Sequence, residues 1–261
     1  MIDIHTHIMP AVDDGSPAED ISLKHLGIMA AAGVTDVVLT PHFIRAGYRP
    51  PHTDRLAKQA ALQKGCQAAG LSLTLHPGAE VYLDSKSLQE INEHKLNINQ
   101  TSYVLVETAM STFPSDLYEI LYQLVKAGYR PILAHPERYQ TVISDPELAR
   151  DFMHRNVYLQ INAGSLLGHY GKRSQQAAWY LLEHGYAHFL ASDNHCHRDD
   201  YPLAKGCELI TRRIDDHLPR ILTEINPRKM LNNEPIPYFY LEQTSGGSEN
   251  FFQRFFRRGK S

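Results

Sequence analysis

The chain has 261 residues, 43% of them apolar, and a formal net charge of −3. α/β barrels often reach this length as one domain, and the apolar content is typical of a globular protein. A charge so close to zero gives no reason to expect nucleic acid as a partner, and three cysteines are too few for a disulfide framework. No apolar run approaches the roughly 18 residues of a membrane-spanning helix, and the first residues do not resemble a signal peptide. We therefore expect a cytoplasmic protein.

Short apolar runs alternate along the chain with segments of helical apolar spacing. Strands are expected, in chain order, at residues 4–7, 35–41, 71–79, 103–106, 131–134, 157–161 and 188–192. Helices are expected at residues 17–33, 56–69, 115–127, 146–154, 174–184, 203–213 and 216–225, and the first looks capped by Ser16, with Glu19 at the capping-box offset. About seven alternations of strand and helix predict an α/β fold built from parallel βαβ units.

Six of the seven runs end in residues that bind metals well. The first run ends in His5-Thr6-His7, and the last is followed by Asp193-Asn194-His195. The runs between them end at His42, Glu80, Glu107 and His135. Only the run at 157–161 ends without a good ligand, at Asn162. The C-terminal strand ends of a barrel converge on one face, so a closed or nearly closed barrel explains this pattern better than an open sheet with one switch point.

The ligand types narrow the choice of metal. Imidazoles and carboxylates without thiolates favour Mn, Fe or Zn. Glu80 and Glu107 are natural bridges, because shared carboxylates can hold two ions about 3.5–4 Å apart. Asp13 and Asp14 follow the first histidines, where the structural alternative is a turn capped by aspartate. We favour Asp14 as a ligand and Asp13 as its neighbour, and the sequence leaves the choice between them open.

Three arginines are candidates for contact with a substrate. Arg138 lies just beyond His135, where a guanidinium can hold phosphate oxygens, although a salt bridge to a local carboxylate is the alternative. Arg198 follows the last histidines and either contacts substrate or pairs with a neighbouring aspartate. Arg45 lies in a loop expected beside the site, where it either binds an acidic or phosphorylated peptide or is solvated.

The C-terminal end has a different composition. We place a boundary after residue 235, with a tail at 236–261 that contains a Ser/Gly linker and a Phe/Arg-rich end. This end can dock peripherally on an anionic membrane or on a partner, whereas the alternative is packing on its own domain or on a second copy in an oligomer.

The motifs together resemble a known family. Residues 1–15 look like the opening of the PHP (polymerase and histidinol phosphatase) superfamily, and more narrowly of the capsule-type bacterial protein-tyrosine phosphatases, the CpsB/CapC group. The resemblance continues through residues 40–42, 78–81, 106–107, 135–139, 162–165 and 192–195, and it covers roughly residues 1–235. His-x-His alone is shared with many metal barrels, but the combination is specific.

The resemblance implies a distorted seven-stranded (β/α)7 barrel with its active site at the C-terminal strand ends. It implies two to three divalent ions, with Mn²⁺ favoured over Fe²⁺ or Zn²⁺. The implied ligand sets are His5, His7, Glu80 and Asp193 for the first ion, Glu80, Glu107 and His135 for the second, and Asp14, His42 and His195 for the third. Arg138, Asp14 and His42 are the implied catalytic residues, and a hydroxide on the metal attacks phosphotyrosine.

The implied substrate is the tyrosine-rich tail of a bacterial tyrosine kinase that controls exopolysaccharide or capsule synthesis. The sequence leaves two alternatives to this function open. One is a PHP phosphomonoesterase for a small substrate such as histidinol phosphate. The other is a non-catalytic module that binds a kinase tail. A nuclease is disfavoured because the sequence indicates no basic groove.

Overall fold

The computed structural model describes residues 1–238, and its strands form two parallel sheets. The three-stranded sheet has the order β1-β2-β4 and the six-stranded sheet the order β3-β5-β6-β7-β8-β9. The strands are β1 Ile2–Asp3, β2 Asp36–Leu39, β3 His42–Phe43, β4 Thr74–Pro77, β5 Glu80–Tyr82, β6 Tyr103–Glu107, β7 Arg130–Ala134, β8 Tyr158–Asn162 and β9 Phe189–Ala191. Every pairing between strands is parallel, which confirms the predicted α/β class.

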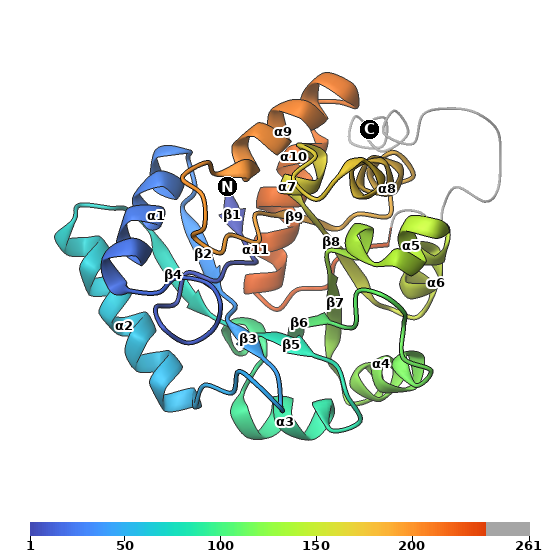
Figure 1. The fold of residues 1–261 in the computed structure, drawn as a ribbon, viewed down its shortest axis with the longest axis horizontal. Coiled ribbons are helices and arrows are strands. Elements are labelled where there is room, and N and C mark those ends of the chain that lie inside the picture. The colour runs from blue at the N-terminus through green and yellow to red at the C-terminus, as the bar shows by residue number, and fades with distance from the viewer. Residues whose placement is uncertain (239–261) are drawn as a thin grey trace, which may run out of the picture.

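Helices surround the strands on the outside of the molecule (Figure 1). They are α1 Glu19–Ala31, α2 His52–Ala68, α3 Ser87–His94, α4 Leu117–Lys126, α5 Gln140–Ser144, α6 Leu148–His154, α7 Ala163–Leu166, α8 Lys172–Glu183, α9 Pro202–Arg213, α10 Leu218–Arg220 and α11 Asn226–Leu231. A π-helical segment, Ile221–Ile225, links the last two. The predicted cap of the first helix is wrong: Ser16 donates its hydroxyl hydrogen bond to the carbonyl of Ala18, and α1 begins at Glu19 without a side-chain cap.

The strands do not form one closed seven-stranded barrel among the described residues. The runs predicted at 35–41 and 71–79 each stop before their ligand, so that β2 and β3, and likewise β4 and β5, lie in different sheets. Pro41 stands between β2 and β3 and has no N–H with which to continue the ladder. The two sheets still meet beside the first strand, through a parallel bridge between Thr6 and Asn194 and a hydrogen bond from the amide of Asp193 to the carbonyl of His5.

Buried apolar side chains form two clusters, a larger one of strand and helix residues and a smaller one made largely of strand residues. The central strands β6 and β8 are buried at every position, as expected when both faces of a parallel sheet are covered. Among the described residues, no helix has the length and apolarity needed to cross a membrane.

The predicted boundary at 235 falls close to the end of the described chain. Ile236 is buried, its carbonyl accepts a hydrogen bond from the hydroxyl of Tyr158, and the ring of Tyr238 stacks on the ring of Tyr158 at 4.6 Å. The Ser/Gly linker and the Phe/Arg-rich end predicted for the tail lie outside the described residues.

Candidate metal centre

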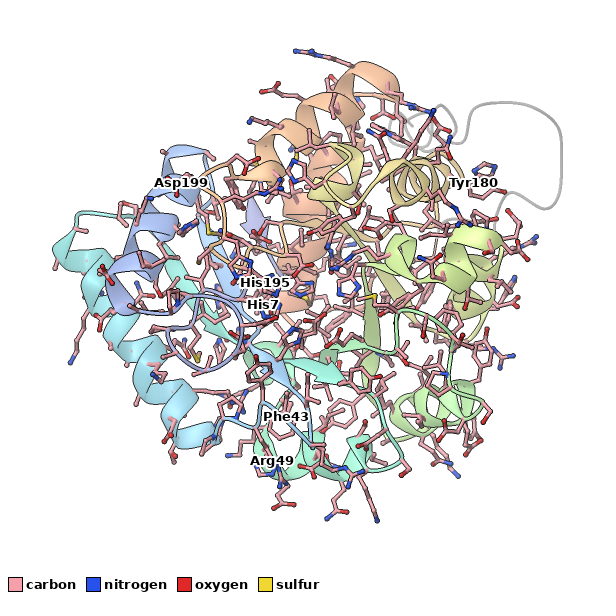
Figure 2. All side chains as sticks on the ribbon, in the orientation of Figure 1. His7, Phe43, Arg49, Tyr180, His195 and Asp199 are labelled. Carbon is pink, nitrogen blue, oxygen red and sulfur yellow. The ribbon has the colours of Figure 1, made fainter. Side chains whose placement is uncertain are left out.

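The structure brings all nine predicted ligands into one cluster. Four overlapping groups have ligand atoms within 4.8 Å of one another: His7, Asp14, His42 and His195; His5, His7 and Asp193; His5, Glu80 and His135; and His42, Glu80 and Glu107. The predicted third set lies within the first group, and Glu80 belongs to two groups, as a bridge requires. The cluster lies near the middle of the face that bears the C-terminal strand ends, where Figure 2 labels His7 and His195.

Two of these residues have unusual backbone conformations. His135 follows β7 with a φ of 37°, and Asp193 follows β9 with a φ of 54°. Non-glycine residues rarely adopt this left-handed region, which costs about 1–3 kcal/mol and occurs preferentially at functional sites. Each residue turns the chain sharply at the end of its strand, and the His135 and Asp193 side chains both lie in the cluster.

The loop after the first strand separates the roles of its two aspartates. Asp13 accepts a hydrogen bond from Nδ1 of His7 at 2.8 Å and another from the amide of His42 at 2.9 Å, so it orients two histidines. Asp14 belongs to a metal-capable group, whereas Asp13 belongs to none. The loop returns to the strand at Gly15, where a Cβ atom would lie only 2.0 Å from the carbonyl oxygen of His7. Glycine is therefore required for this close approach.

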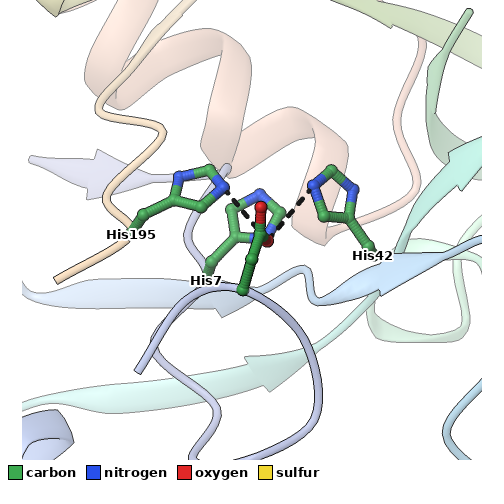
Figure 3. A group of neighbouring side chains, drawn as sticks. His7, His42 and His195 are labelled. Atoms are coloured by element: carbon green, nitrogen blue, oxygen red, sulfur yellow. Dashed lines mark ion pairs between the residues drawn. The ribbon is translucent and has the colours of Figure 1, made fainter. Parts of the chain in front are cut away.

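The first group forms the open side of the cluster. Figure 3 shows the imidazoles of His7, His42 and His195 around one carboxylate, with ion pairs drawn from two of them. His42 and His195 each place Nε2 3.6 Å from an oxygen of Asp14, whose side chain is 49% exposed. Glu80 and Asp193, by contrast, are almost fully buried. The cluster is therefore open to solvent at Asp14.

The buried side of the cluster fits a divalent cation. Oε2 of Glu80 lies 3.1–3.2 Å from nitrogens of His5, His7 and His42, yet it has no hydrogen-bond partner. Oδ1 of Asp193 is likewise buried and unpartnered. Buried acceptors are normally satisfied, and several lone pairs that converge without a donor are unfavourable unless a cation lies between them. The chemistry of the donors, nitrogen and oxygen without sulfur, fits the Mn, Fe and Zn group.

Electrostatics also indicate a site that attracts positive charge. Burial lowers the pKa of His42, but the carboxylates of Glu107 and Glu80, which lie 3.0 and 3.1 Å from its Nδ1, outweigh burial and raise the pKa to about 11. Burial likewise opposes the nearby carboxylates of Asp13 and Glu80, which raise the pKa of His7 to about 10. The carboxylates therefore hold positive charge at these imidazoles, and a divalent ion competes with protons for the same nitrogen atoms.

A cavity of about 330 Å³ adjoins the cluster and contains two of the three predicted substrate contacts. Arg138 and Arg198 both line it, together with Tyr170, Asp193 and His195. Arg138 donates a hydrogen bond to Asp193 at 3.0 Å, and its guanidinium lies 4.3 Å from the centre of the Tyr170 ring. Arg45 is not among the residues that line this cavity; it donates a hydrogen bond to Asp84 at 2.7 Å. Substrate contact by all three arginines stays a prediction.

The sequence reasoning missed two buried amides beside the cluster. Gln160 contacts Nδ1 of His5 at 2.8 Å, and Asn162 donates to Asp193 at 2.7 Å. The available signal was the period of the strand, because alternate residues of β8 point to one face, which is the face of the metal-capable groups. The end of β8 therefore provides amides that contact the candidate ligands His5 and Asp193, in place of a metal ligand of its own.

Residues 1–232 match the family described as capsular polysaccharide synthesis, CpsB/CapC. The chain belongs to this family. Among its curated relatives, tyrosine-protein phosphatase YwqE from Bacillus subtilis is 30% identical over 240 residues, which cover 90% of this chain and 93% of the relative. Tyrosine-protein phosphatase CpsB from Streptococcus agalactiae serotype III is 28% identical over 244 residues, which cover 90% of this chain and 100% of the relative.

Solved structures agree with the CpsB/CapC assignment. A structure from the study of YwqE from Bacillus subtilis and CpsB from Streptococcus pneumoniae, described as unique metal-dependent tyrosine phosphatases, superposes with a TM-score of 0.87 at 28% identity and covers 92% of this chain and 98% of its own. A histidinol phosphate phosphatase from Lactococcus lactis, complexed with Zn, L-histidinol and phosphate, has a TM-score of 0.52 at 14% identity, with 81% and 92% covered. The second likeness shows a shared fold alone.

Proposed function

We propose that this protein is a metal-dependent tyrosine-protein phosphatase that hydrolyses phosphotyrosine. The observation that carries the proposal is the set of buried, unpartnered ligand atoms of Glu80 and Asp193 within a cluster of nine metal-capable residues. Its family membership and the tyrosine phosphatase names of its relatives agree with this chemistry. The enzyme is a phosphoric monoester hydrolase.

The proposed cofactors are two to three divalent ions, with Mn²⁺ favoured over Fe²⁺ and Zn²⁺. The overlapping groups would hold them, with Glu80 shared between neighbouring positions. Bound divalent ions supply Lewis acidity toward phosphoryl oxygens and make water a stronger nucleophile. The chain itself fixes part of the ligand geometry, because Asp13 accepts a hydrogen bond from Nδ1 of His7 and so orients its ring.

The cavity beside the cluster is the proposed site for the phosphoryl group. Two guanidinium groups, those of Arg138 and Arg198, line it and can offset the negative charge that develops during transfer. A cysteine nucleophile is disfavoured, because burial raises the pKa of Cys196 to about 12 and that of Cys207 to about 11, and because Cys66 is fully buried. Nucleophilic cysteines need the opposite shift.

The proposed substrate protein is a bacterial tyrosine kinase of capsule or exopolysaccharide synthesis, and the proposed location is the cytoplasm. We also propose that the two sheets are best understood as one distorted seven-stranded barrel, interrupted at Pro41 and at Gly78-Ala79. The backbone contacts between residues 5–7 and 193–194 support this description. We also propose that residues 1–235 form one domain and that a separate tail contacts a membrane or a partner.

The test is hydrolysis of a phosphotyrosine peptide by metal-stripped protein, with Mn²⁺, Zn²⁺, Fe²⁺ and Mg²⁺ added back separately. Histidinol phosphate serves as the comparison substrate. Metal-dependent turnover that favours the peptide and disappears in His42→Ala is the expected result. Turnover of histidinol phosphate alone would assign the protein to a small-molecule phosphatase, and stoichiometric metal binding without turnover would favour a tail-binding module.

A further inference from the structure

Two amides at the end of β8 connect two residues of the metal cluster. Nδ1 of His5 lies 2.8 Å from Oε1 of Gln160, and Nε2 of Gln160 donates to Oδ1 of Asn162 at 2.8 Å. Nδ2 of Asn162 then donates to Oδ2 of Asp193 at 2.7 Å. All four side chains are buried, so no solvent competes for these bonds. Glu137 anchors the strand end, because its carboxylate accepts the amide hydrogen of Asn162 at 2.9 Å.

The direction of this chain of hydrogen bonds follows from Asp193. An ionised carboxylate only accepts hydrogen bonds, so Asn162 must present its NH₂ group to Asp193 and its oxygen to Gln160. Gln160 must then present its own NH₂ group to Asn162 and its oxygen to His5. His5 must therefore carry its proton on Nδ1. Reversing either amide would set two acceptors, or two donors, against each other in a buried site, which costs about 1–3 kcal/mol per unsatisfied group.

We propose that Gln160 and Asn162 form an amide relay that positions both His5 and Asp193 for metal binding. With its proton on Nδ1, His5 directs the lone pair of Nε2 into the cluster, 3.3 Å from Oδ1 of Asp193. Asp193 uses Oδ2 for the relay and for Arg138, so its unpartnered Oδ1 is left for the cation. The proposal rests on the proposed function only in requiring that the cluster binds metal.

The relay works differently from the support of His7. Asp13 accepts a hydrogen bond from Nδ1 of His7, so the same tautomer is set there by a charged group. Gln160 sets the tautomer of His5 without adding a negative charge to a buried site that already contains Glu80 and Asp193. An amide also supplies both a donor and an acceptor, which lets two amides in series link His5 to Asp193. Neither Gln160 nor Asn162 titrates, so the arrangement does not change with pH through the relay itself.

The first test measures Mn²⁺ affinity in the full-length protein. Asn162→Leu keeps the approximate volume and removes the donor to Asp193, and loss of such a supporting partner weakens metal binding about 10- to 100-fold. Asn226→Leu is the control: Asn226 is also a buried asparagine, but its side chain donates to the carbonyl of His188 at 2.8 Å, whereas Asn162 bonds to Gln160 and to the candidate ligand Asp193. Both variants should lose stability, but only Asn162→Leu should bind Mn²⁺ less tightly in a chelator competition titration.

The second test observes the hydrogen bond of His5 directly. In Zn²⁺-loaded protein, ¹H–¹⁵N NMR is expected to show the Nδ1 proton of His5 with the downfield shift of a hydrogen-bonded group, and Gln160→Met should weaken Zn²⁺ affinity and remove this shift. If Asn162→Leu does not fold, Gln160→Met carries both measurements. The double variant should lose less affinity than the product of the single losses, because each single change leaves an amide group unpaired.

Unchanged metal affinity in both variants, with the downfield shift of the His5 Nδ1 proton retained in Gln160→Met, would overturn the relay. The readouts are independent of phosphatase activity. Weakened metal binding in a protein that hydrolyses no phosphotyrosine would support the relay and refute the proposed function. An active phosphatase whose Asn162→Leu and Gln160→Met variants bind metal normally would support the proposed function and refute the relay.

Discussion

Replacing Arg138 with alanine tests the proposed phosphoryl site most directly. The Arg138 side chain is 27% exposed, and its guanidinium donates one hydrogen bond to Asp193 at 3.0 Å and lies 4.3 Å from the centre of the Tyr170 ring, so it is held in place at the cavity wall. Loss of a preorganised donor to a developing anion costs about 10²- to 10³-fold in turnover, or about 2.7–4 kcal/mol. We expect Arg138→Ala to lower kcat/KM for a phosphotyrosine peptide by this factor.

Metal binding should not weaken in the same variant. Asp193 keeps its hydrogen bond from Asn162 at 2.7 Å, and removing a neighbouring positive charge increases the attraction of the cluster for a cation. Arg138→Lys should recover only part of the activity, because lysine keeps the charge but loses the planar fork and the stacking on Tyr170. Elemental analysis of the purified variants should therefore give the Mn²⁺ content of the unmodified protein.

Arg213→Ala is a matched control. Arg213 donates to Glu183 at 2.7 Å and lies 4.4 Å from the ring of Trp179, so it makes the same two kinds of contact outside the cavity. Its loss should change kcat/KM by no more than about twofold, as for most surface substitutions. Equal activity in Arg138→Ala and Arg213→Ala would refute the role of Arg138. A loss of activity explained by a loss of Mn²⁺ would refute the reasoning about charge.

Three further predictions concern the two loop aspartates, the ring beside Arg138 and a buried histidine. Asp14→Ala should remove about one bound Mn²⁺ per chain, whereas Asp13→Ala should keep the stoichiometry and weaken affinity about 10- to 100-fold through His7; equal stoichiometric losses would contradict the assignment. Tyr170→Leu should lower kcat/KM about threefold to tenfold by releasing Arg138, and Tyr170→Phe should not, because the ring face is kept; equally poor variants would contradict this. Burial lowers the pKa of His188 to about 3, so as pH falls from about 6.5 toward 3 the unfolded chain binds a proton that the folded chain does not, and stability is lost. His188→Gln should reduce this loss by up to about 5 kcal/mol in denaturant titrations. An unchanged dependence of stability on pH would rule out this contribution of His188.

The positions of the ligands could be predicted because they depend on a simple rule of topology. Parallel strands end on one face, and Glu107 ends β6 while His135 follows β7. His42 and Glu80 instead begin β3 and β5, just after the breaks that end β2 and β4. Local sequence is then enough to bring together residues that are far apart in the chain. Asp13 and Asp14 were harder to distinguish, because they are adjacent in one turn and differ only in tertiary contacts: Asp13 accepts from Nδ1 of His7, whereas Asp14 faces His42 and His195.

Other features depend on contacts that the sequence does not display. Helix α3, Ser87–His94, was not predicted, because a helix of this length presents too few apolar residues for its period to be recognised. The division into two sheets depends on where backbone hydrogen bonds stop, and a single proline within an apolar run does not reveal it. The amides of β8 were visible as residues, but their function depends on which side chains from other strands they meet.

The absence of a metal ligand at the end of β8 has a physical explanation. A metal-binding side chain in place of Asn162 would add a further charge or lone pair to a buried cluster in which Glu80 and Asp193 already have unpartnered oxygens. It would also leave the NH₂ group of Gln160 without its acceptor, so that Gln160 would no longer be held with its oxygen toward Nδ1 of His5. An imidazole free to exchange tautomers presents a donor to the metal for part of the time. An amide pair avoids both costs, because it accepts from His5, donates to Asp193 and carries no charge. In the proposed relay, β8 thus contributes to the metal centre by orienting ligands from two other parts of the chain.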